Sequence, residues 1–458
     1  MDSGKALAAE ARPRTCRGRV DWLMLDGVLC ELPDHYATEV SWTEGFTSKG
    51  EKIVGGGPPE ISRFLYRLYL NTETLSSSSG VDYGGSWVSR ARAVAAHRDC
   101  ILLCFIIIDD PDPFCFKDES GEYFTEPEIR EELFVVQAFP GTRPKLINLP
   151  RCVNSNLAVS SNFGIRCSDD GEFVVAQLAV TSKIFSGQSD CPVTAELCCL
   201  FGKDGTWRTT KCVPIHNAEG EDHLIWWVTD AVITFGSYIC WVDYLRGILF
   251  YDVSNLNPEL KYVPLPVNPY EGNVNEEFGV RGPVSAYRSL CVTEDGNAIM
   301  FVDVSSSKFW FYGRRRHPSD YAISSWKMAK DSFKWIPDGR IDEDHYFALT
   351  KQLNLPLAPL EFPLVDRKDP QTIYCTLKRE SCVTREIHLV AVKMSSKLIT
   401  ATPAYTTGSS EADMGSSTAS FNLSDHEPFL HCDFTQYQDL DVSKARTTKK
   451  KEIETRES

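Results

Sequence analysis

The segment Trp226–Pro266 reads WWVTDAVITFGSYICWVDYLRGILFYDVSNLNPELKYVPLP, and it predicts the architecture of the whole chain. Three apolar runs follow one another with short turns between them, and a Pro-rich stretch ends the last run. Short runs rich in Val, Ile, Phe, Trp and Tyr are typical of antiparallel strands. Weaker copies of this plan precede and follow the segment, so we interpret it as one unit of a structural repeat.

Copies of the plan recur at intervals of roughly 60 to 80 residues, as expected for a repeat of several strands. They begin near Trp22, Cys100, Glu172, Ser237, Asn297 and Thr372. Several copies end alike, on a strand that runs into a proline: PKLINLP (144–150), TWRTTKCVP (206–214), LKYVPLP (260–266), FKWIP (333–337) and KLITATP (397–403). Proline has no N–H to donate to a ladder, so these endings predict edge strands.

The repeat predicts an all-β, mainly antiparallel fold. A single set of three or four strands cannot bury both of its faces alone, so we expect a β-propeller-like array of about five to six three- or four-stranded blades. The alternative is two β domains, a sandwich followed by a second sheet structure. Asp-Gly pairs at 170–171, 204–205 and 295–296 predict tight hairpin turns with a positive φ at glycine.

The domain boundaries follow from composition. Residues 1–19 predict a disordered arm, residues 20–404 the propeller-like domain, and residues 405–458 a disordered low-complexity and charged tail. Two local predictions depart from the repeat. Asp26-Gly27 predicts a hairpin within Val20–Leu32, and Glu126–Glu132 predicts a short helix with Pro127 in its first turn.

The overall composition favours a soluble globular protein, with 42% hydrophobic and 24% charged residues. A net charge of −15 argues against nucleic acid or an anionic membrane surface as a general partner. No apolar window approaches the roughly 18 residues that a membrane span needs. The 16 cysteines are scattered through predicted strands and no secretory signal is seen, so we expect reduced thiols in an intracellular protein, cytoplasmic or nuclear and not secreted.

The sequence predicts no catalytic, cofactor or metal site, because it contains no His-Glu-x-x-His, P-loop or Gly-x-Ser-x-Gly motif. Asp243 and Asp252 flank one hairpin and could pair for acid–base work, but a similar Asp303 in another copy favours local turn bonds. We expect a structural core motif within the repeat: Trp241, Asp243, Gly247, Asp252, Pro264 and Pro266. A basic run after an aromatic stretch is a candidate contact for a phosphate or an acidic partner: Arg314, Arg315, Arg316 and His317.

These motifs resemble a known family. Trp241-Val242-Asp243-Tyr244, Arg246-Gly247, Asp252-Val253 and Tyr262-Val263-Pro264-Leu265-Pro266 are similar to the middle of the plant "domain of unknown function 1618" proteins, which are expanded in grasses. The close resemblance covers about 45 residues, roughly 226–266. It implies no catalytic residues and no established activity. It implies a β domain in the style of kelch-like domains that follow F-boxes, here without an F-box segment in residues 1–19.

We therefore carry three hypotheses. The first is a non-enzymatic protein-interaction module of unknown partner. The second is a small-ligand binder or enzyme with a central-channel site built from carboxylates such as Asp26, Asp243 and Asp303. The third is a degenerate copy of the family that forms no stable fold.

Overall fold

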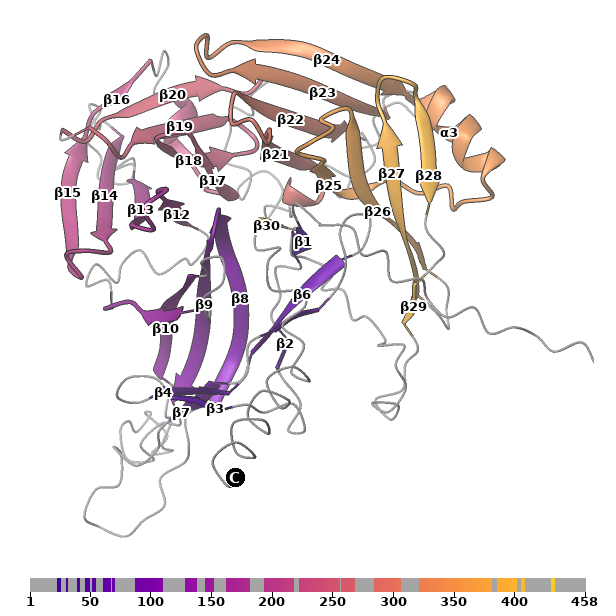
Figure 1. The fold of residues 1–458 in the computed structure, drawn as a ribbon. Coiled ribbons are helices and arrows are strands. Elements are labelled where there is room, and N and C mark those ends of the chain that lie inside the picture. The colour runs from indigo at the N-terminus through magenta and orange to yellow at the C-terminus, as the bar shows by residue number, and fades with distance from the viewer. Residues whose placement is uncertain are drawn as a thin grey trace, which may run out of the picture.

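The chain forms an all-β structure in which five small antiparallel sheets are the blades of a propeller (Figure 1). The computed structural model describes residues 23–25, 30–31, 39–41, 46–49, 52–54, 61–66, 68–70, 87–109, 128–137, 145–151, 162–181, 193–217, 222–255, 257–267, 284–305, 321–380, 385–401, 405–407 and 430–432. The described part contains little helix. This architecture confirms the predicted fold class, with five blades.

Each blade is a four-stranded meander, so that consecutive strands are neighbours. Blade 1 contains β8 (Trp87–His97), β9 (Cys100–Asp109), β10 (Glu128–Gln137) and β11 (Lys145–Asn148). Blade 2 contains β12 (Phe163–Cys167), β13 (Phe173–Thr181), β14 (Thr194–Phe201) and β15 (Trp207–Val213). Blade 3 contains β17 (Ala231–Phe235), β18 (Tyr238–Asp243), β19 (Gly247–Asp252) and β20 (Leu260–Pro264), with β16 (Ile215–His216) added parallel to β20.

The last two blades follow the same plan. Blade 4 contains β21 (Arg288–Val292), β22 (Ala298–Ser305), β23 (Ala322–Ala329) and β24 (Trp335–Asp342). Blade 5 contains β25 (Glu361–Val365), β26 (Thr372–Glu380), β27 (Arg385–Lys393) and β28 (Leu398–Ala401), with β29 (Tyr405–Thr407) also paired to β27. Three helical segments accompany the blades: α1 (Asp222–Ile225), η6 (Val284–Ala286) and α3 (Glu343–Gln352).

The structure explains the register of the predicted repeat. The starts expected near Cys100, Glu172, Ser237, Asn297 and Thr372 coincide with the second strands of the five blades, β9, β13, β18, β22 and β26. The proline-terminated stretches coincide with the fourth strands, β11, β15, β20, β24 and β28. The fourth strand lies at the outer edge of the ladder in blades 1, 2, 4 and 5, where a missing N–H costs least, and in blade 3 β16 pairs outside β20. The sixth predicted start, near Trp22, precedes β1 and does not open a blade.

The first strand of each blade lies innermost, because β8, β12, β17, β21 and β25 contact one another in succession. We call the end of the propeller at which first and second strands connect the turn face. The predicted Asp-Gly turns are confirmed: Gly171, Gly205 and Gly296 have φ of 83°, 62° and 66°. Such angles are open to glycine and strained for most other residues.

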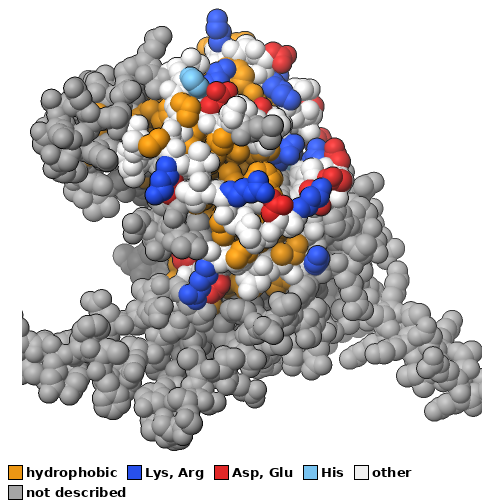
Figure 2. All heavy atoms as spheres, turned by 90° about the vertical axis from the view of Figure 1, so that its left-hand side faces the viewer, with side chains coloured by type: hydrophobic (Ala, Val, Ile, Leu, Met, Phe, Trp, Pro, Cys, Tyr) orange, Lys and Arg blue, Asp and Glu red, His pale blue; other side chains and the backbone are white. Residues whose placement is uncertain are grey.

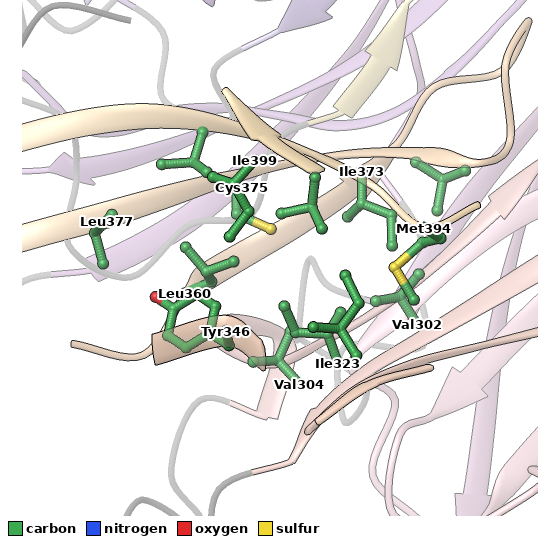
Figure 3. Packing of buried hydrophobic residues seen from close by; sticks show 14 of the residues in the cluster. Val302, Val304, Ile323, Tyr346, Leu360, Ile373, Cys375, Leu377, Met394 and Ile399 are labelled. Atoms are coloured by element: carbon green, nitrogen blue, oxygen red, sulfur yellow. The ribbon is translucent and has the colours of Figure 1, made fainter. Parts of the chain in front are cut away.

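Apolar side chains fill the spaces between blades. Between blades 4 and 5, the packed residues come from both sheets, and Figure 3 shows Val302, Val304 and Ile323 facing Ile373, Cys375 and Leu377. Tyr346 of α3 is fully buried in this cluster, and its hydroxyl donates to the carbonyl of Ala358 at 2.7 Å. Helix α3 therefore covers this interface between two blades.

Indole groups of outer strands bind the ends of neighbouring blades. Trp207 Nε1 in β15 donates to the carbonyl of Pro150, which follows β11, at 2.6 Å. Trp335 Nε1 in β24 donates to the carbonyl of Pro264, at the end of β20, at 2.9 Å. The similar Trp and Pro residues of the predicted endings thus join blade 1 to blade 2 and blade 3 to blade 4 by the same contact.

Strands from both ends of the chain form two further sheets. One joins β1 (Leu23–Leu25), β2 (Cys30–Glu31), β5 (Lys52–Val54), β6 (Ile61–Tyr66) and β30 (Leu430–Cys432), and the other joins β3 (Glu39–Ser41), β4 (Phe46–Lys49) and β7 (Leu68–Leu70). The first contacts blade 1 through β30 and β8. The predicted hairpin at Asp26-Gly27 is wrong, since β1 and β2 each pair with β6 in parallel.

Two other local expectations differ from the structure. Residues from Glu128 form β10 instead of a helix, because Leu133–Val136 pairs with Ile101–Cys104 and the ladder continues back through the glutamates. Strands β29 and β30 lie within the predicted disordered tail, where they pair with β27 and β1. In both cases a distant partner strand decides the conformation, and composition alone does not reveal it. Residues 1–19 and the remainder of the tail lie outside the described residues.

Candidate functional site

Basic side chains from three blades gather at the centre of the turn face. His97 ends β8, Arg98 begins the following turn, Arg166 lies near the end of β12, and Arg367 follows β25. We call these four residues the inner-turn cluster. All three arginines are close enough to His97 to repel a proton from its ring. The cluster therefore joins first strands and inner turns of blades 1, 2 and 5.

Each arginine of the cluster is anchored to a neighbouring blade. Arg166 Nε donates to the carbonyl of Gly236, in the β17–β18 turn, at 3.0 Å. Arg367 Nε donates to the carbonyl of Val292, at the end of β21, at 3.2 Å. Arg98 pairs with the carboxylate of Asp169, whose side chain is 94% exposed. These contacts hold the three guanidinium groups in defined positions at the turn face.

His97 is a neutral acceptor in the folded protein. Its Nδ1 accepts the backbone N–H of Cys167 at 3.0 Å, so the ring proton lies on Nε2. Burial, followed by the charges of Arg98, Arg166 and Arg367, lowers the pKa of His97 from 6.5 to about 3. The imidazole therefore adds no positive charge near neutral pH and serves as a fixed contact between β8 and β12.

His97 predicts a pH dependence of stability. Between pH 6.5 and about 3 the unfolded chain binds a proton at His97 that the folded protein does not, so the free energy of unfolding falls as the pH falls through this window. Its contribution is complete above pH 6.5. We expect urea unfolding of the His97→Gln variant to be less sensitive to pH than the parent protein, by about 1–2 kcal/mol between pH 6.5 and 5.

Glutamine is chosen because its side-chain oxygen can still accept the Cys167 N–H. The matched control is His216→Gln, which removes an exposed histidine that pairs with Glu259 at 3.2 Å on β16. If the free energy of unfolding changed with pH equally in the His97→Gln variant and in the parent, the assignment of a buried neutral imidazole would be contradicted.

The β18–β19 hairpin of blade 3 contains a fully buried ion pair. Asp243 Oδ2 accepts from Arg246 Nη1 at 3.0 Å and from the backbone N–H of Val228 at 3.0 Å. Asp243 Oδ1 accepts from the backbone N–H of Leu245 at 2.9 Å. The two side chains are 0% and 1% exposed. Three donors thus surround the Asp243 carboxylate, which closes the β18–β19 turn.

A second buried pair joins this hairpin to blade 4. Arg288 Nε donates to Asp303 Oδ1 at 2.6 Å, and Arg288 Nη1 donates to the carbonyl of Tyr244. The Tyr244 hydroxyl in turn accepts the backbone N–H of Leu290 at 3.3 Å. Asp243 is therefore bound to an arginine within blade 3, and Asp303 to an arginine within blade 4.

The other residues of the predicted core motif have distinct places. Trp241 is fully buried, and Asp252 accepts the backbone N–H of Ser254 at 3.0 Å in a local turn. At Gly247 a Cβ atom would lie 2.4 Å from the Tyr262 ring, so only glycine allows β19 and β20 to approach this closely. Pro264 ends β20, and Pro266 follows it half-buried.

The sequence contains two Phe-x-Asp-Val stretches, at 250–253 and 301–304, that are not structurally equivalent. Asp252 ends β19, the third strand of blade 3, and makes a turn. Asp303 lies within β22, the second strand of blade 4, and is paired with Arg288. A shared tetrapeptide thus occupies different positions in the two blades.

Several predicted site residues lie outside the described residues: Asp26, Arg314, Arg315, Arg316 and His317. Within the described ranges, no group of three or more His, Cys, Asp or Glu side chains is placed to hold a metal ion. Among the helices of the same ranges, none is both long and apolar enough to cross a membrane.

The sequence analysis missed the inner-turn cluster. Its members are separated by up to 270 residues, and they share no motif in the sequence. One signal was present, since Arg98, Arg166 and Arg367 all shortly precede the second strand of a repeat, at Cys100, Phe173 and Thr372. Aligning the repeats on that strand would have placed the arginines at the same end of their blades.

Solved structures with a similar course of the chain have low sequence identity. The β-propeller domain of Nup133 from Vanderwaltozyma polyspora is 9% identical with a TM-score of 0.33, covering 81% of this chain and 74% of its own. A sialidase of Trypanosoma rangeli is 10% identical with a TM-score of 0.28, covering 84% and 56%. The NanB sialidase of Streptococcus pneumoniae is 8% identical with a TM-score of 0.31, covering 75% and 67%. No curated protein sequence matches the chain.

The sequence model of one protein family matches part of the repeat region. The matching family is described as "Protein of unknown function (DUF1618)", and its sequence model matches residues 241–374, from β18 of blade 3 to β26 of blade 5. The match includes the Asp243–Arg246 hairpin and its contact with Arg288, and it extends well beyond the stretch on which the resemblance was based. Over residues 241–374 the chain therefore matches the DUF1618 family model.

Proposed function

We propose that the protein is a non-enzymatic protein-interaction module whose turn face binds an acidic segment of a partner protein. The observation that carries this proposal is the inner-turn cluster, in which three arginines from separate blades meet around a neutral histidine. Carboxylates are the natural ligands of guanidinium groups, which bind them with paired hydrogen bonds.

The anchoring of the arginines supports binding. A side chain already held by one hydrogen bond loses less conformational entropy when a ligand arrives than a free one. Arg166 is half-buried and anchored through Nε to Gly236. Arg98 is bound to the exposed Asp169, and an incoming carboxylate can replace this partner at low cost because exposed ion pairs contribute little.

The charge of the whole chain adds specificity. With a net charge of −15, the protein repels acidic chains in general, so a bound acidic segment must reach a local group of cations. On the side that carries β15, positive and negative side chains are interspersed over the described area (Figure 2).

The carboxylates also favour a binding role over a catalytic one. General acid–base chemistry needs a carboxyl group that can exchange protons with a substrate. Asp243 accepts hydrogen bonds from three donors, and Asp303 is paired with Arg288. Both carboxylates are held by hydrogen bonds within their own blades, which weakens the hypothesis of a carboxylate site in a central channel.

Binding of a fluorescein-labelled hexaglutamate peptide tests the proposal, with hexaglutamine as the neutral comparison. We expect fluorescence anisotropy to show binding of hexaglutamate only, weakened by salt as expected for exposed charges. Arg166→Gln should raise the Kd about tenfold or more, since hydrogen bonds to charged groups contribute about 1.5–3 kcal/mol.

The matched control is Arg208→Gln on β15, which also removes an arginine from an exposed pair, with Asp204. It should leave the Kd unchanged. Equal binding by the Arg166→Gln variant and the parent, or equal affinity for hexaglutamine, would refute the assignment of the turn face. If the hexaglutamate measurement supports the proposal, the partner can be sought among proteins that the parent captures from native extract and the Arg166→Gln variant does not capture.

A further inference from the structure

A pair of thiols lies directly beneath the inner-turn cluster. Cys100 is the first residue of β9 in blade 1, and Cys167 is the last residue of β12 in blade 2. The two side chains are hydrogen-bonded to each other and belong to one apolar cluster between the blades. Gln137 Nε2 also contacts Cys100 Sγ at 3.8 Å. Two thiols from different blades are thus in direct contact.

Contacts with His97 position the backbone of both cysteines. His97 pairs with Cys100 across the β8–β9 hairpin, and the His97 ring accepts the backbone N–H of Cys167 at 3.0 Å. One residue therefore fixes the backbone positions of both cysteines. Arg98 and its partner Asp169 lie on the exposed side of this arrangement.

We propose that Cys100 and Cys167 are a redox-sensitive pair, and that hydrogen peroxide converts them to a disulfide that links blade 1 to blade 2. This inference does not depend on the proposed binding function. Both cysteines are free thiols in the structure, so the disulfide is a second, oxidised state.

The two thiols have different roles in the reaction. The hydrogen bond from Cys100 has the largest effect on the pKa of the Cys167 thiol and lowers it, against the opposing effects of burial and the charge of Asp99. The same hydrogen bond, together with burial, raises the pKa of the Cys100 thiol. The thiolate is the nucleophile in sulfur oxidation, so Cys167 reacts first and Cys100 resolves the product.

The chemistry is balanced by one peroxide. The Cys167 thiolate attacks one peroxide oxygen, the O–O bond breaks, and the released hydroxide takes up a proton to leave as water, which yields a sulfenic acid at Cys167. Cys100 then attacks the sulfenic sulfur, gives up its thiol proton, and displaces the hydroxyl group as a second water. Two thiols are oxidised to one disulfide, and the peroxide is reduced to two waters.

Peptide mapping of the full-length protein tests the proposal without any substitution. After peroxide treatment, alkylation of remaining thiols and trypsin digestion without reductant, we expect a cross-linked species that joins peptides 99–117 and 167–183 and is lost on treatment with dithiothreitol. Peptide 167–183 contains Cys167 as its one cysteine, whereas peptide 99–117 contains Cys100, Cys104 and Cys115. The exposed Cys212 reports whether the peroxide treatment oxidised the sample at all.

Three variants test which cysteines form the disulfide. Cys100→Ser and Cys167→Ser should each abolish the cross-linked species. Cys104→Ser is the matched control, because Cys104 is equally buried and lies four residues further along the same strand, about 13 Å away, and it should leave the cross-link intact. In the parent, cross-linking should raise Tm by about 2–5 °C, since it closes a loop of roughly 70 residues.

Failure to form the species while Cys212 is oxidised would overturn the proposal. So would its persistence in the Cys100→Ser variant, which would assign the reaction to another cysteine of peptide 99–117. Either result leaves the hexaglutamate measurement unaffected, so the two proposals fail separately.

Discussion

Replacing Trp241 with alanine is expected to lower the free energy of unfolding by about 3–5 kcal/mol. The Trp241 side chain is 0% exposed, and it packs in β18 against residues of blade 2 as well as its own sheet. Its Nε1 donates to the carbonyl of Asn162, just before β12, at 2.7 Å. The substitution leaves a cavity and an unpaired carbonyl in the interface between blades 2 and 3.

Urea unfolding followed by far-UV circular dichroism measures this loss without relying on indole fluorescence. The matched variant Trp241→Phe keeps most of the apolar volume but has no N–H donor, so it should lose clearly less than the alanine variant. A cost below about 1 kcal/mol for Trp241→Ala would mean that the side chain is not packed between the blades.

The second large effect is expected for Asp243→Ala, also about 3–5 kcal/mol. Removing this carboxylate leaves the Arg246 guanidinium, 1% exposed, without its buried counter-ion. It also removes the acceptor of the Val228 and Leu245 backbone N–H groups. A buried charge that has lost its partner is costly because water cannot replace the missing contact.

The same unfolding measurement on three related variants separates charge from packing. Asp252→Ala removes another aspartate of the same hairpin, which is hydrogen-bonded to Ser254 and Ser237 in a turn, and it should cost no more than about 1 kcal/mol. The double variant Asp243→Ala/Arg246→Met removes both buried charges and should recover part of the loss. Equal costs for Asp243→Ala and Asp252→Ala would contradict the role of the buried pair.

Much of the fold could be predicted, because the features that encode a blade are local. The apolar run from Tyr238 to Asp243 is long enough for one strand, and Asp295-Gly296 specifies its own turn through the conformational freedom of glycine. Proline at the end of an outer strand is also a local signal, since it depends on one missing N–H. These signals repeat, and the repeat predicted a propeller.

Predictions based on one segment alone were less successful. The glutamate-rich residues 128–132 have the composition of a helix, yet they continue the ladder between β9 and β10. Leu23–Leu25 precedes an Asp-Gly turn signal, yet it pairs with β6 and with β30 from the far end of the chain. Pairing with a distant strand supplies hydrogen bonds that outweigh a weak local preference.

The candidate site was the least predictable part. His97, Arg98, Arg166 and Arg367 have no common motif, and they meet because the first strands of the blades surround one axis. The two carboxylates that the sequence suggested as candidates are bound in ion pairs inside their own blades, Asp243 to Arg246 and Asp303 to Arg288.

The amino-acid sequence by itself determined the strand content, the turns, the five recurring outer-strand endings and the family resemblance around Trp241, because each depends on neighbours within a few residues. Only the tertiary structure decided the number of blades, the partners of Asp243 and Asp303, and the meeting of His97 with three arginines and of Cys100 with Cys167. The contacts of His97 with Arg166 and Arg367, and of Cys100 with Cys167, join residues tens to hundreds of positions apart, and the closing of the blades into a propeller creates them.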